Sequence, residues 1–271
     1  MEAVRDDEQS PPKAGRTGLL QGRLSEVSGR LTVACLFTAA GGYMDAFSYL
    51  AHGHVFANSQ TGNFVFFAVF ASGGQWAQAG RHLPPIVAFA LGVAIAKLLD
   101  VHSSQHPFRA ALHCQAFELA ILCVLVLVGA RMPNASVVPI ISFVAALQNT
   151  SFDKIGPLSF NSAMTTGNLR EATSGLVLWI VGRETAENRR KAMSLGLVCC
   201  SFLVGAFFGA SYTRFHMEHV LVPCVAIVAA GFLLTWRLRR KATVGMLPNM
   251  PRMQKSVDQL FPRSRPGSGA R

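Results

Sequence analysis

Apolar residues occur along the chain in long runs, separated by short polar breaks. About 20 apolar residues in a helix cross the hydrocarbon core of a bilayer, and six of the runs approach that length. The two starting near 61 and 172 are shorter, and both follow polar stretches that contain glycine. The pattern predicts an all-α fold, a polytopic transmembrane helical bundle of six full spans plus two short or broken helices. The runs cover residues 31–50, 61–72, 83–99, 112–130, 136–152, 172–182, 192–212 and 219–236.

The runs of the first half recur in the second half at an offset of 105 residues. The triplet Thr61-Gly62-Asn63 recurs at this offset as Thr166-Gly167-Asn168. The same offset superimposes the other runs of the two halves, which a chance match of three residues would not do. We therefore expect a duplicated unit, with repeat 1 at about 31–130 and repeat 2 at about 136–236.

The number of crossings depends on the two short runs. If they cross fully, each repeat has four spans, the repeats are parallel and the chain crosses eight times. If they are broken or re-entrant, each repeat has three spans, the repeats are inverted and the chain crosses six times. Both arrangements place the two termini and the basic loop 183–191 on the cytoplasmic side, as the positive-inside rule requires. We favour the six-crossing arrangement.

Composition and charge exclude several classes of protein. Only 14% of the residues are charged, against about 25% in soluble domains. This scarcity excludes a soluble enzyme, a secreted disulfide scaffold and a disordered regulator. Most of the formal net charge of +11 comes from residues 237–271, which hold nine Lys or Arg and one acid, whereas the five basic and five acidic residues of 1–30 cancel. Basic residues at the ends of a membrane protein fix orientation and contact anionic lipid. The bilayer, and not a nucleic acid, is thus the expected partner, and a homo-oligomer stays open.

The two ends are expected to lie outside the bundle. Residues 1–30 are polar and lack the early apolar core of a cleavable signal peptide, so they predict a disordered cytoplasmic tail and a retained first span. Residues 237–271 predict a basic cytoplasmic tail. All six cysteines lie within apolar runs without metal-ligand spacing, so no metal or cofactor is expected.

Two pairs of motifs carry a resemblance to a known family. The first pair is Gly41-Gly42-Tyr43-Met44-Asp45-Ala46-Phe47-Ser48 and Val55-Phe56-Ala57-Asn58-Ser59-Gln60-Thr61-Gly62-Asn63. The second pair is Ala145-Ala146-Leu147-Gln148-Asn149-Thr150 and Met164-Thr165-Thr166-Gly167-Asn168-Leu169. Over about residues 31–236 the chain resembles the YoaK family of bacterial inner-membrane proteins. The resemblance implies a multi-spanning, transporter-like protein of the inner (plasma) membrane and gives no mechanism.

Asp45 is the most informative single residue, because it is the acid of the first span. A carboxylate in hydrocarbon is costly unless it faces a cavity, pairs or takes up a proton, so an intramembrane acid is a functional hypothesis. The structural alternative is that Asp45 lies at the outer headgroup level, with His52 and His54 just beyond it.

The two Thr-Gly-Asn triplets are the second candidate site. Glycine permits backbone angles that expose amides and carbonyls, while the threonine and asparagine side chains add neutral polar groups. Thr61, Gly62, Asn63, Thr166, Gly167 and Asn168 are therefore candidate ligands of a small polar solute or ion. The alternative is that each triplet only caps an ordinary helix.

Asn149 is a further candidate, since it lies close to the repeat counterpart of Asp45. Its amide either completes a polar centre or bonds helix to helix. Among the other charges within runs, Glu118 and Lys97 could pair with each other, or Lys97 could extend to the membrane surface.

The leading functional hypothesis is a secondary transporter or permease for a small polar solute or ion, with a cavity between the repeats. An intramembrane enzyme using Asp45, His52 and His54 as acid and base groups is the alternative, although no hydrolase or metalloprotease motif is present. A sensor or assembly subunit that docks through its basic C-terminal tail is the third hypothesis.

Overall fold

The protein is a bundle of helices. The computed structural model describes residues 13–102, 107–151, 154–155, 158–159, 165–183, 185–215 and 219–246. The helices in this part are α1 (Lys13–Ala51), α2 (Gln60–Ser72), α3 (Trp76–Ala79), η1 (Gly80–His82), α4 (Leu83–His102), α5 (Pro107–Val128), η2 (Gly129–Arg131), α6 (Asn134–Ser151), α7 (Thr165–Ile180), α8 (Ala186–Phe215) and α9 (Val222–Met246). A minimal antiparallel strand pair, β1 (Lys154–Ile155) and β2 (Leu158–Ser159), separates α6 from α7.

Helix α1 packs against α8 and α9. The contact with α8 is close because α8 presents glycines to the α1 backbone: a Cβ added at Gly209 would lie 2.6 Å from the Tyr43 carbonyl oxygen, and one at Gly205 would collide with the Ala39 carbonyl. Small residues at four-residue spacing permit such an approach of two helices. Gly205 lies against Ala39, and Gly209, four residues later, lies against Tyr43, also four residues later. Helices α1 and α8 are therefore parallel.

Helix α6 makes the corresponding contacts with α4 and α5. Here α4 supplies the glycine, since a Cβ added at Gly92 would lie 2.5 Å from the Phe143 carbonyl oxygen of α6. A second group of buried residues, Ala96, Cys114 and Leu147, joins α4, α5 and α6 further along. The contacts of α6 with α4 and α5 therefore correspond to those of α1 with α8 and α9.

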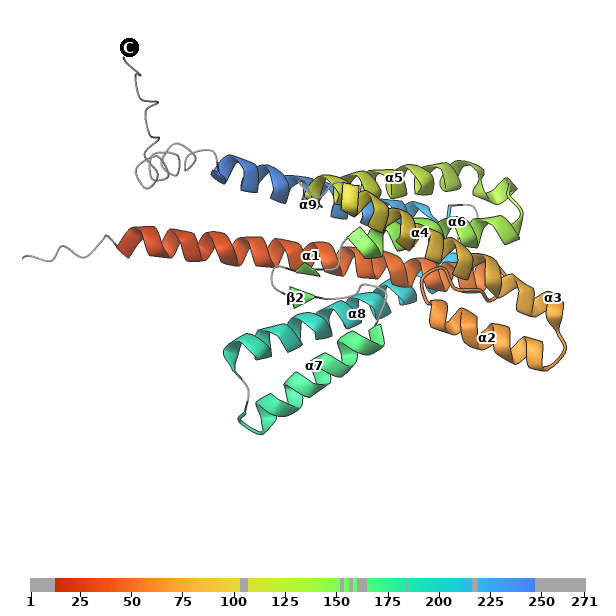
Figure 1. Ribbon diagram of the computed structural model, residues 1–271, viewed down its shortest axis with the longest axis horizontal. Coiled ribbons are helices and arrows are strands. Elements are labelled where there is room, and N and C mark those ends of the chain that lie inside the picture. The colour runs from red at the N-terminus through yellow and green to blue at the C-terminus, as the bar shows by residue number, and fades with distance from the viewer. Residues whose placement is uncertain are drawn as a thin grey trace, which may run out of the picture.

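The long helices alternate in direction. Along the long axis of Figure 1, α1, α5 and α8 run from left to right, and α4, α6 and α9 run from right to left. The short helix α2 lies toward the right end of the molecule, and α7 with the α7–α8 turn lies toward the lower left. The start of α1, the end of α9 and the α7–α8 turn therefore share one end of the bundle.

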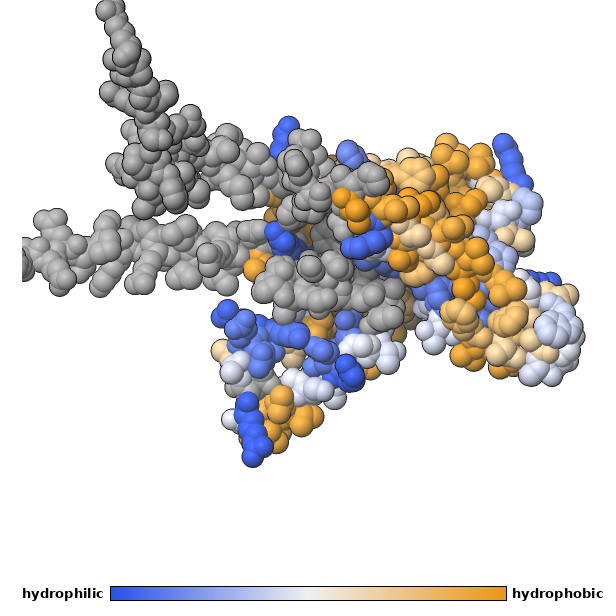
Figure 2. Space-filling view, viewed as in Figure 1, coloured by the Kyte–Doolittle hydropathy of each residue, from blue (hydrophilic) through white to orange (hydrophobic). Residues whose placement is uncertain are grey.

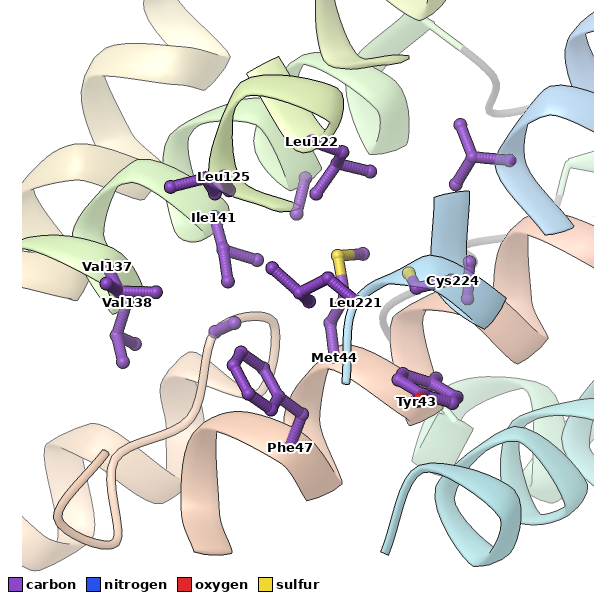
Figure 3. Close-up of a cluster of buried hydrophobic side chains, with 14 of the residues drawn as sticks. Tyr43, Met44, Phe47, Leu122, Leu125, Val137, Val138, Ile141, Leu221 and Cys224 are labelled. Atoms are coloured by element: carbon purple, nitrogen blue, oxygen red, sulfur yellow. The ribbon is translucent and has the colours of Figure 1, made fainter. Parts of the chain in front are cut away.

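The main hydrophobic core joins both halves of the chain. Its buried side chains come from α1, α5, α6, α9 and the segments before α2 and α9. Figure 3 shows Met44 and Phe47 of α1 facing Leu122 of α5 and Ile141 of α6, with Leu221 and Cys224 beside them. Between helices in a bilayer, close van der Waals packing of such side chains contributes to cohesion.

The outer faces of the helices are apolar, as expected for a chain in lipid. Exposed large apolar residues include Leu91 of α4, Leu127 of α5, and Leu203 and Phe207 of α8. Figure 2 shows apolar side chains covering the part of the visible face over α4 and α5, while hydrophilic side chains gather at the α7–α8 turn. Two helical stretches of the described chain are long and apolar enough to cross a membrane, Trp76–Leu99 and Ala186–Phe215, and three apolar helices are shorter, Leu112–Val128, Ala135–Thr150 and Val222–Leu238.

Two element boundaries differ from the sequence prediction. Helix α1 begins at Lys13, whereas the apolar run begins at Leu31 and a disordered tail was expected over 1–30; polar residues can continue a helix beyond the apolar segment that reveals it. Helix α7 begins at Thr165 although its apolar run begins near 172, because its first turns carry polar residues. The predicted C-terminal tail begins within α9, and its residues from 247 onward lie outside the described part.

Candidate functional site

Asp45 binds the segment that leads from α1 into α2. Its side chain is 4% exposed. Oδ1 accepts hydrogen bonds from the backbone amides of Asn58 at 2.6 Å and Ser59 at 3.3 Å, and Oδ2 accepts one from the Ser59 hydroxyl. These amides lie immediately before α2, where a helix favours negative charge. Asp45 is therefore enclosed by protein and holds the start of α2 against α1.

Asn58 connects this carboxyl to the second half of the chain. Its side-chain oxygen accepts a hydrogen bond from Asn149 Nδ2 of α6 at 3.2 Å, and its own amide nitrogen donates to the Gly41 carbonyl at 3.3 Å. One residue earlier, the Ala57 carbonyl accepts a hydrogen bond from the Ser142 hydroxyl of α6 at 2.7 Å. We call Asp45, Asn58, Ser59, Ser142 and Asn149 the junction cluster. It joins α1, the break before α2, and α6.

Asn63 closes the same segment from inside α2. It is fully buried, accepts a hydrogen bond from the Phe56 amide at 3.0 Å and donates to the Phe56 carbonyl at 2.8 Å. Its amide nitrogen also donates to Gln60 Oε1 at 2.9 Å. Asn63 thus forms a side-chain bridge across the loop. The interpretation that this triplet caps α2 is wrong. The N-cap residue of α2 is Ser59, and the Asn63 side chain bonds the backbone of Phe56, which precedes the helix.

His82 extends this polar network from η1. Its Nδ1 lies 3.3 Å from Asn63 Oδ1, and its ring stacks on Phe66 and Phe70 of α2 with centroid distances of 5.5 and 5.8 Å. The side chain is 2% exposed. His82 therefore fixes α2 against the start of α4 through both a polar and an aromatic contact.

The second triplet opens α7 and packs toward α8. Asn168 is buried, while Thr166 and Gly167 are exposed. The Cys199 thiol of α8 donates to the Thr165 carbonyl at 3.6 Å. Thr61 is likewise exposed and Asn63 buried, so the asparagine is the inward-facing member of both triplets.

A further group of buried polar side chains lies deeper in the bundle. Gln115 and Glu118 of α5 are both fully buried, and within the described residues neither their amide nor their carboxyl atoms have a hydrogen-bond partner. The hydroxyl of Thr38 in α1 and the amide nitrogen of Gln148 in α6 share this property. An unpaired polar atom in an apolar interior is unfavourable by a few kcal/mol, so these side chains need an explanation beyond packing.

Of the two alternatives for Lys97, pairing with Glu118 is wrong. Glu118 is fully buried, whereas the side chain of Lys97 is exposed. A lysine in α4 that points outward cannot reach a carboxyl enclosed by the inner face of α5. Extension of Lys97 toward the membrane surface stays a prediction.

Several residues of these networks were not predicted from the sequence. Asn58, Ser59, Ser142, His82 and Gln115 are ordinary polar residues within or beside apolar runs. Asn58, Ser59, Ser142 and His82 matter because of hydrogen bonds or close polar contacts with residues of other segments, and Gln115 because it is buried without a hydrogen-bond partner among the described residues. Polarity inside an apolar run is a signal that Ser142 and Gln115 share with Glu118, whereas Asn58, Ser59 and His82 lie in the breaks between runs.

Comparison with known proteins identifies the family. Residues 33–234 match the family described as "Protein of unknown function (DUF1275)". The chain belongs to this family. It is 26% identical over 219 residues to the UPF0700 transmembrane protein YoaK of Bacillus subtilis (strain 168), a match that covers 78% of this chain and 95% of the relative. No solved structure matches the chain. The resemblance to the YoaK family is confirmed, and the chain is an integral membrane protein.

Proposed function

We propose that this DUF1275 protein is a permease for a small polar solute or ion, built from two inverted repeats. The observation that carries the proposal is the junction cluster, in which Asn149 of the second repeat bonds the break between α1 and α2 of the first repeat. Broken helices beside buried polar groups, at the interface of two repeats, are where transporters bind their substrates.

The order and packing of the helices support the repeat. Helices α1, α2, α4 and α5 correspond in order to α6, α7, α8 and α9. Exchanging the two sets converts the contacts of α1 with α8 and α9 into those of α6 with α4 and α5. The corresponding long helices run in opposite directions (Figure 1), which favours inverted over parallel repeats and six crossings over eight.

The charges support an orientation with both termini in the cytoplasm. Four basic residues lie at the α7–α8 turn: Arg183 in the turn itself, and Arg189, Arg190 and Lys191 in the first two turns of α8. This loop lies at the same end of the bundle as the start of α1 and the end of α9 (Figure 1). Since basic loops stay on the cytoplasmic side, we place this end in the cytoplasm of a bacterial cell and the α2–α3 turn outside.

The candidate ligands are neutral amides and one carboxyl. Asp45, Asn63 and Asn149 are held around residues 56–59, where backbone groups are not committed to a helix. Such groups are tolerated at membrane depth only where protein or water satisfies them. A small polar solute that competes for these hydrogen bonds would loosen the contact between the repeats, and this exchange is the step that we assign to transport.

The contacts give less support to an enzyme. The His52 ring packs edge-on against Phe47 with centroids 4.9 Å apart, and the His54 ring packs against Tyr49 at 4.7 Å. The Asp45 carboxyl is occupied by Asn58 and Ser59. Acid and base groups must converge on one substrate, and none of these contacts brings the three side chains together.

Counterflow in proteoliposomes tests the proposal. Vesicles are loaded with one unlabelled solute from a panel of amino acids, polyols and monovalent cations, and entry of the labelled form is measured. We expect exchange of at least one panel member in the wild type, loss of exchange in Asp45→Ala and Asn149→Ala, and wild-type exchange in Gln78→Ala, which truncates an exposed amide. Wild-type exchange in both site variants would contradict the assignment, and exchange of no panel member would contradict transport of these solute classes.

A further inference from the structure

Glu118 differs from Asp45 in how its carboxyl is satisfied. Asp45 accepts hydrogen bonds from two amides and a hydroxyl. Both carboxyl oxygens of Glu118 are buried and have no hydrogen-bond partner within the described residues. An ionised carboxyl in this state would carry an unpaired charge inside a membrane protein, whereas a protonated one would not. Asp45 is therefore suited to holding structure, and Glu118 to exchanging a proton.

The neighbours of Glu118 include a second unsatisfied side chain on the same helix face. Gln115, Glu118, Leu122 and Leu125 follow each other at intervals of three and four residues, and all are buried, so they form one face of α5. Gln115 is therefore one turn from Glu118, with both its amide nitrogen and its amide oxygen unpartnered.

Helix α6 presents a matching face. Val138, Ile141, Ala145 and Gln148 are buried at the corresponding intervals. Helices α5 and α6 form an antiparallel hairpin through η2, so successive turns of the two helices lie opposite each other. Leu122 lies opposite Ile141 in the core. One turn further from η2, Glu118 lies opposite Ala145, and in the next turn Gln115 lies opposite Gln148. The unpartnered atom of Gln148 is its amide nitrogen, a hydrogen-bond donor.

No cationic side chain that the structure describes neutralises this carboxyl. Cys224 of α9 and Tyr43 of α1 are buried in the same core cluster as Leu122 of α5. Helix α6 contains no titratable residue. Lys97 of α4 and Arg131 of η2 have exposed side chains. On α5 itself, His113 is exposed and Cys114 is buried.

We infer that Glu118 takes up and releases the coupling proton of the permease, with the amides of Gln115 and Gln148 as its partners when it is ionised. This inference rests on the proposed function, since it assigns the coupling ion of the same protein. In one state the carboxyl holds the proton. In the other its O–H bond breaks, the proton passes to water on one side of the membrane, and the carboxylate accepts N–H groups from the two glutamines.

The donor set favours a proton over a metal cation. A metal ion would need several oxygen ligands, whereas the unpartnered atom of Gln148 is a nitrogen that donates. The position between α5, α6 and α9 also places the group where the two proposed repeats meet, so a change in its charge would bias how they pack against each other.

Two measurements on the full-length protein test the inference, and neither requires the transported solute. The first is infrared spectroscopy of the protein in lipid, which detects the carbonyl band of a protonated carboxyl. We expect this band in the wild type, its loss in Glu118→Gln, and its retention in the control Glu187→Gln, which changes an exposed glutamate at the start of α8. A band that persists in Glu118→Gln would overturn the inference.

The second measurement is proton movement into proteoliposomes that contain a pH-sensitive dye, driven by a potassium diffusion potential. We expect movement in the wild type and in Glu187→Gln, a reduced rate in Glu118→Asp, and loss to the level of protein-free vesicles in Glu118→Gln. Replacing all sodium by choline should leave the rate of proton movement unchanged. A requirement for sodium would overturn the inference, because the coupling ion would then be a metal ion and not a proton. Wild-type movement in a folded Glu118→Gln, judged by size-exclusion chromatography, or no movement in the wild type, would also overturn it.

Failure of solute counterflow would leave the infrared result standing, so failure of the proposed function and failure of this inference can be distinguished.

Discussion

The side-chain amide of Asn149 donates a hydrogen bond to Asn58 Oδ1 at 3.2 Å, and this bond joins two residues that are 91 positions apart. It connects the first helix of the second proposed repeat to the break in the first. We expect Asn149→Ala to lower the free energy of unfolding by about 0.5–1.5 kcal/mol, the usual net value of one hydrogen bond. Asn149→Asp should cost more, because a carboxylate would face the Asn58 side-chain oxygen.

Thermal unfolding in detergent, followed by circular dichroism, measures both variants of Asn149. The exposed amide variant Gln78→Ala is the control and should unfold like the wild type. Equal stability of Asn149→Asp and Asn149→Ala would show that Asn58 does not present its oxygen to this site.

Truncation of Asp45 should release the segment before α2. Asp45→Ala leaves the amides of Asn58 and Ser59 without their acceptor, and we expect a loss of about 1.5–3 kcal/mol, as for hydrogen bonds to a charged group. Asp45→Asn keeps one acceptor oxygen and should lose less. Limited proteolysis within residues 52–59 measures the release directly, and a cleavage rate in Asp45→Ala equal to that of the wild type would contradict the role.

The contact between α1 and α8 should tolerate no side chain at Gly205. A Cβ there would collide with the backbone of Ala39, so Gly205→Ala must separate the helices, and we expect a cost of about 1–3 kcal/mol, as for overpacking. Gly196→Ala in the same helix is the matched control, because an added Cβ there has nothing within 4 Å. Stability measured by thermal unfolding should fall for Gly205→Ala alone, and a fall for both would point to the helix backbone instead of the contact.

The two contacts of His82 can be separated by substitution. His82→Phe keeps the stacking on Phe66 and Phe70 and removes the polar contact with Asn63, so we expect a loss of about 1 kcal/mol or less. His82→Ala removes both and should lose about 3 kcal/mol or more, as for truncation of a buried aromatic side chain. Similar losses in thermal unfolding for the two variants would assign the role of His82 to the polar contact alone.

The proposed orientation can be tested with single cysteines in a chain whose six native cysteines are replaced by alanine. Arg183→Cys lies in the basic α7–α8 turn, and Gly74→Cys lies in the exposed turn between α2 and α3. In intact cells, a membrane-impermeant maleimide should label position 74 and leave position 183 unlabelled until the cells are opened. Labelling of both positions in intact cells would contradict the cytoplasmic placement of the α7–α8 turn.

The sequence predicted the helices better than their ends. Apolar runs located α4, α5, α6, α8 and α9, because lipid and core both require apolar side chains over the length of a helix. The runs missed the polar beginnings of α1 and α7, where backbone hydrogen bonds continue without an apolar face. The strand pair at 154–159 was also missed, since elements of two residues carry no periodic signal.

The candidate site was predicted in part. The sequence selected Asp45, Asn63 and Asn149 by their polarity within apolar runs, and the structure connects Asp45 to Asn149 through Asn58. From the sequence, the threonine and the asparagine of each triplet are equal candidates. The structure distinguishes them by burial, because the asparagines face inward and the threonines face outward. His82 and Gln115 could not be predicted, because their significance depends on which residue of another helix faces them.

The sequence alone determined that this chain is a helical membrane protein of the YoaK type, because scarcity of charge, long apolar runs and family motifs are properties of the linear chain. The tertiary structure alone decided which polar residues are satisfied. Asp45 and Glu118 are both acids within apolar runs, yet Asp45 is enclosed by hydrogen-bond donors, whereas neither carboxyl oxygen of Glu118 has a hydrogen-bond partner in the part of the chain that the structure describes. That difference depends on which helices pack together, and it separates the carboxyl that bonds the segment before α2 from the one to which we assign proton exchange.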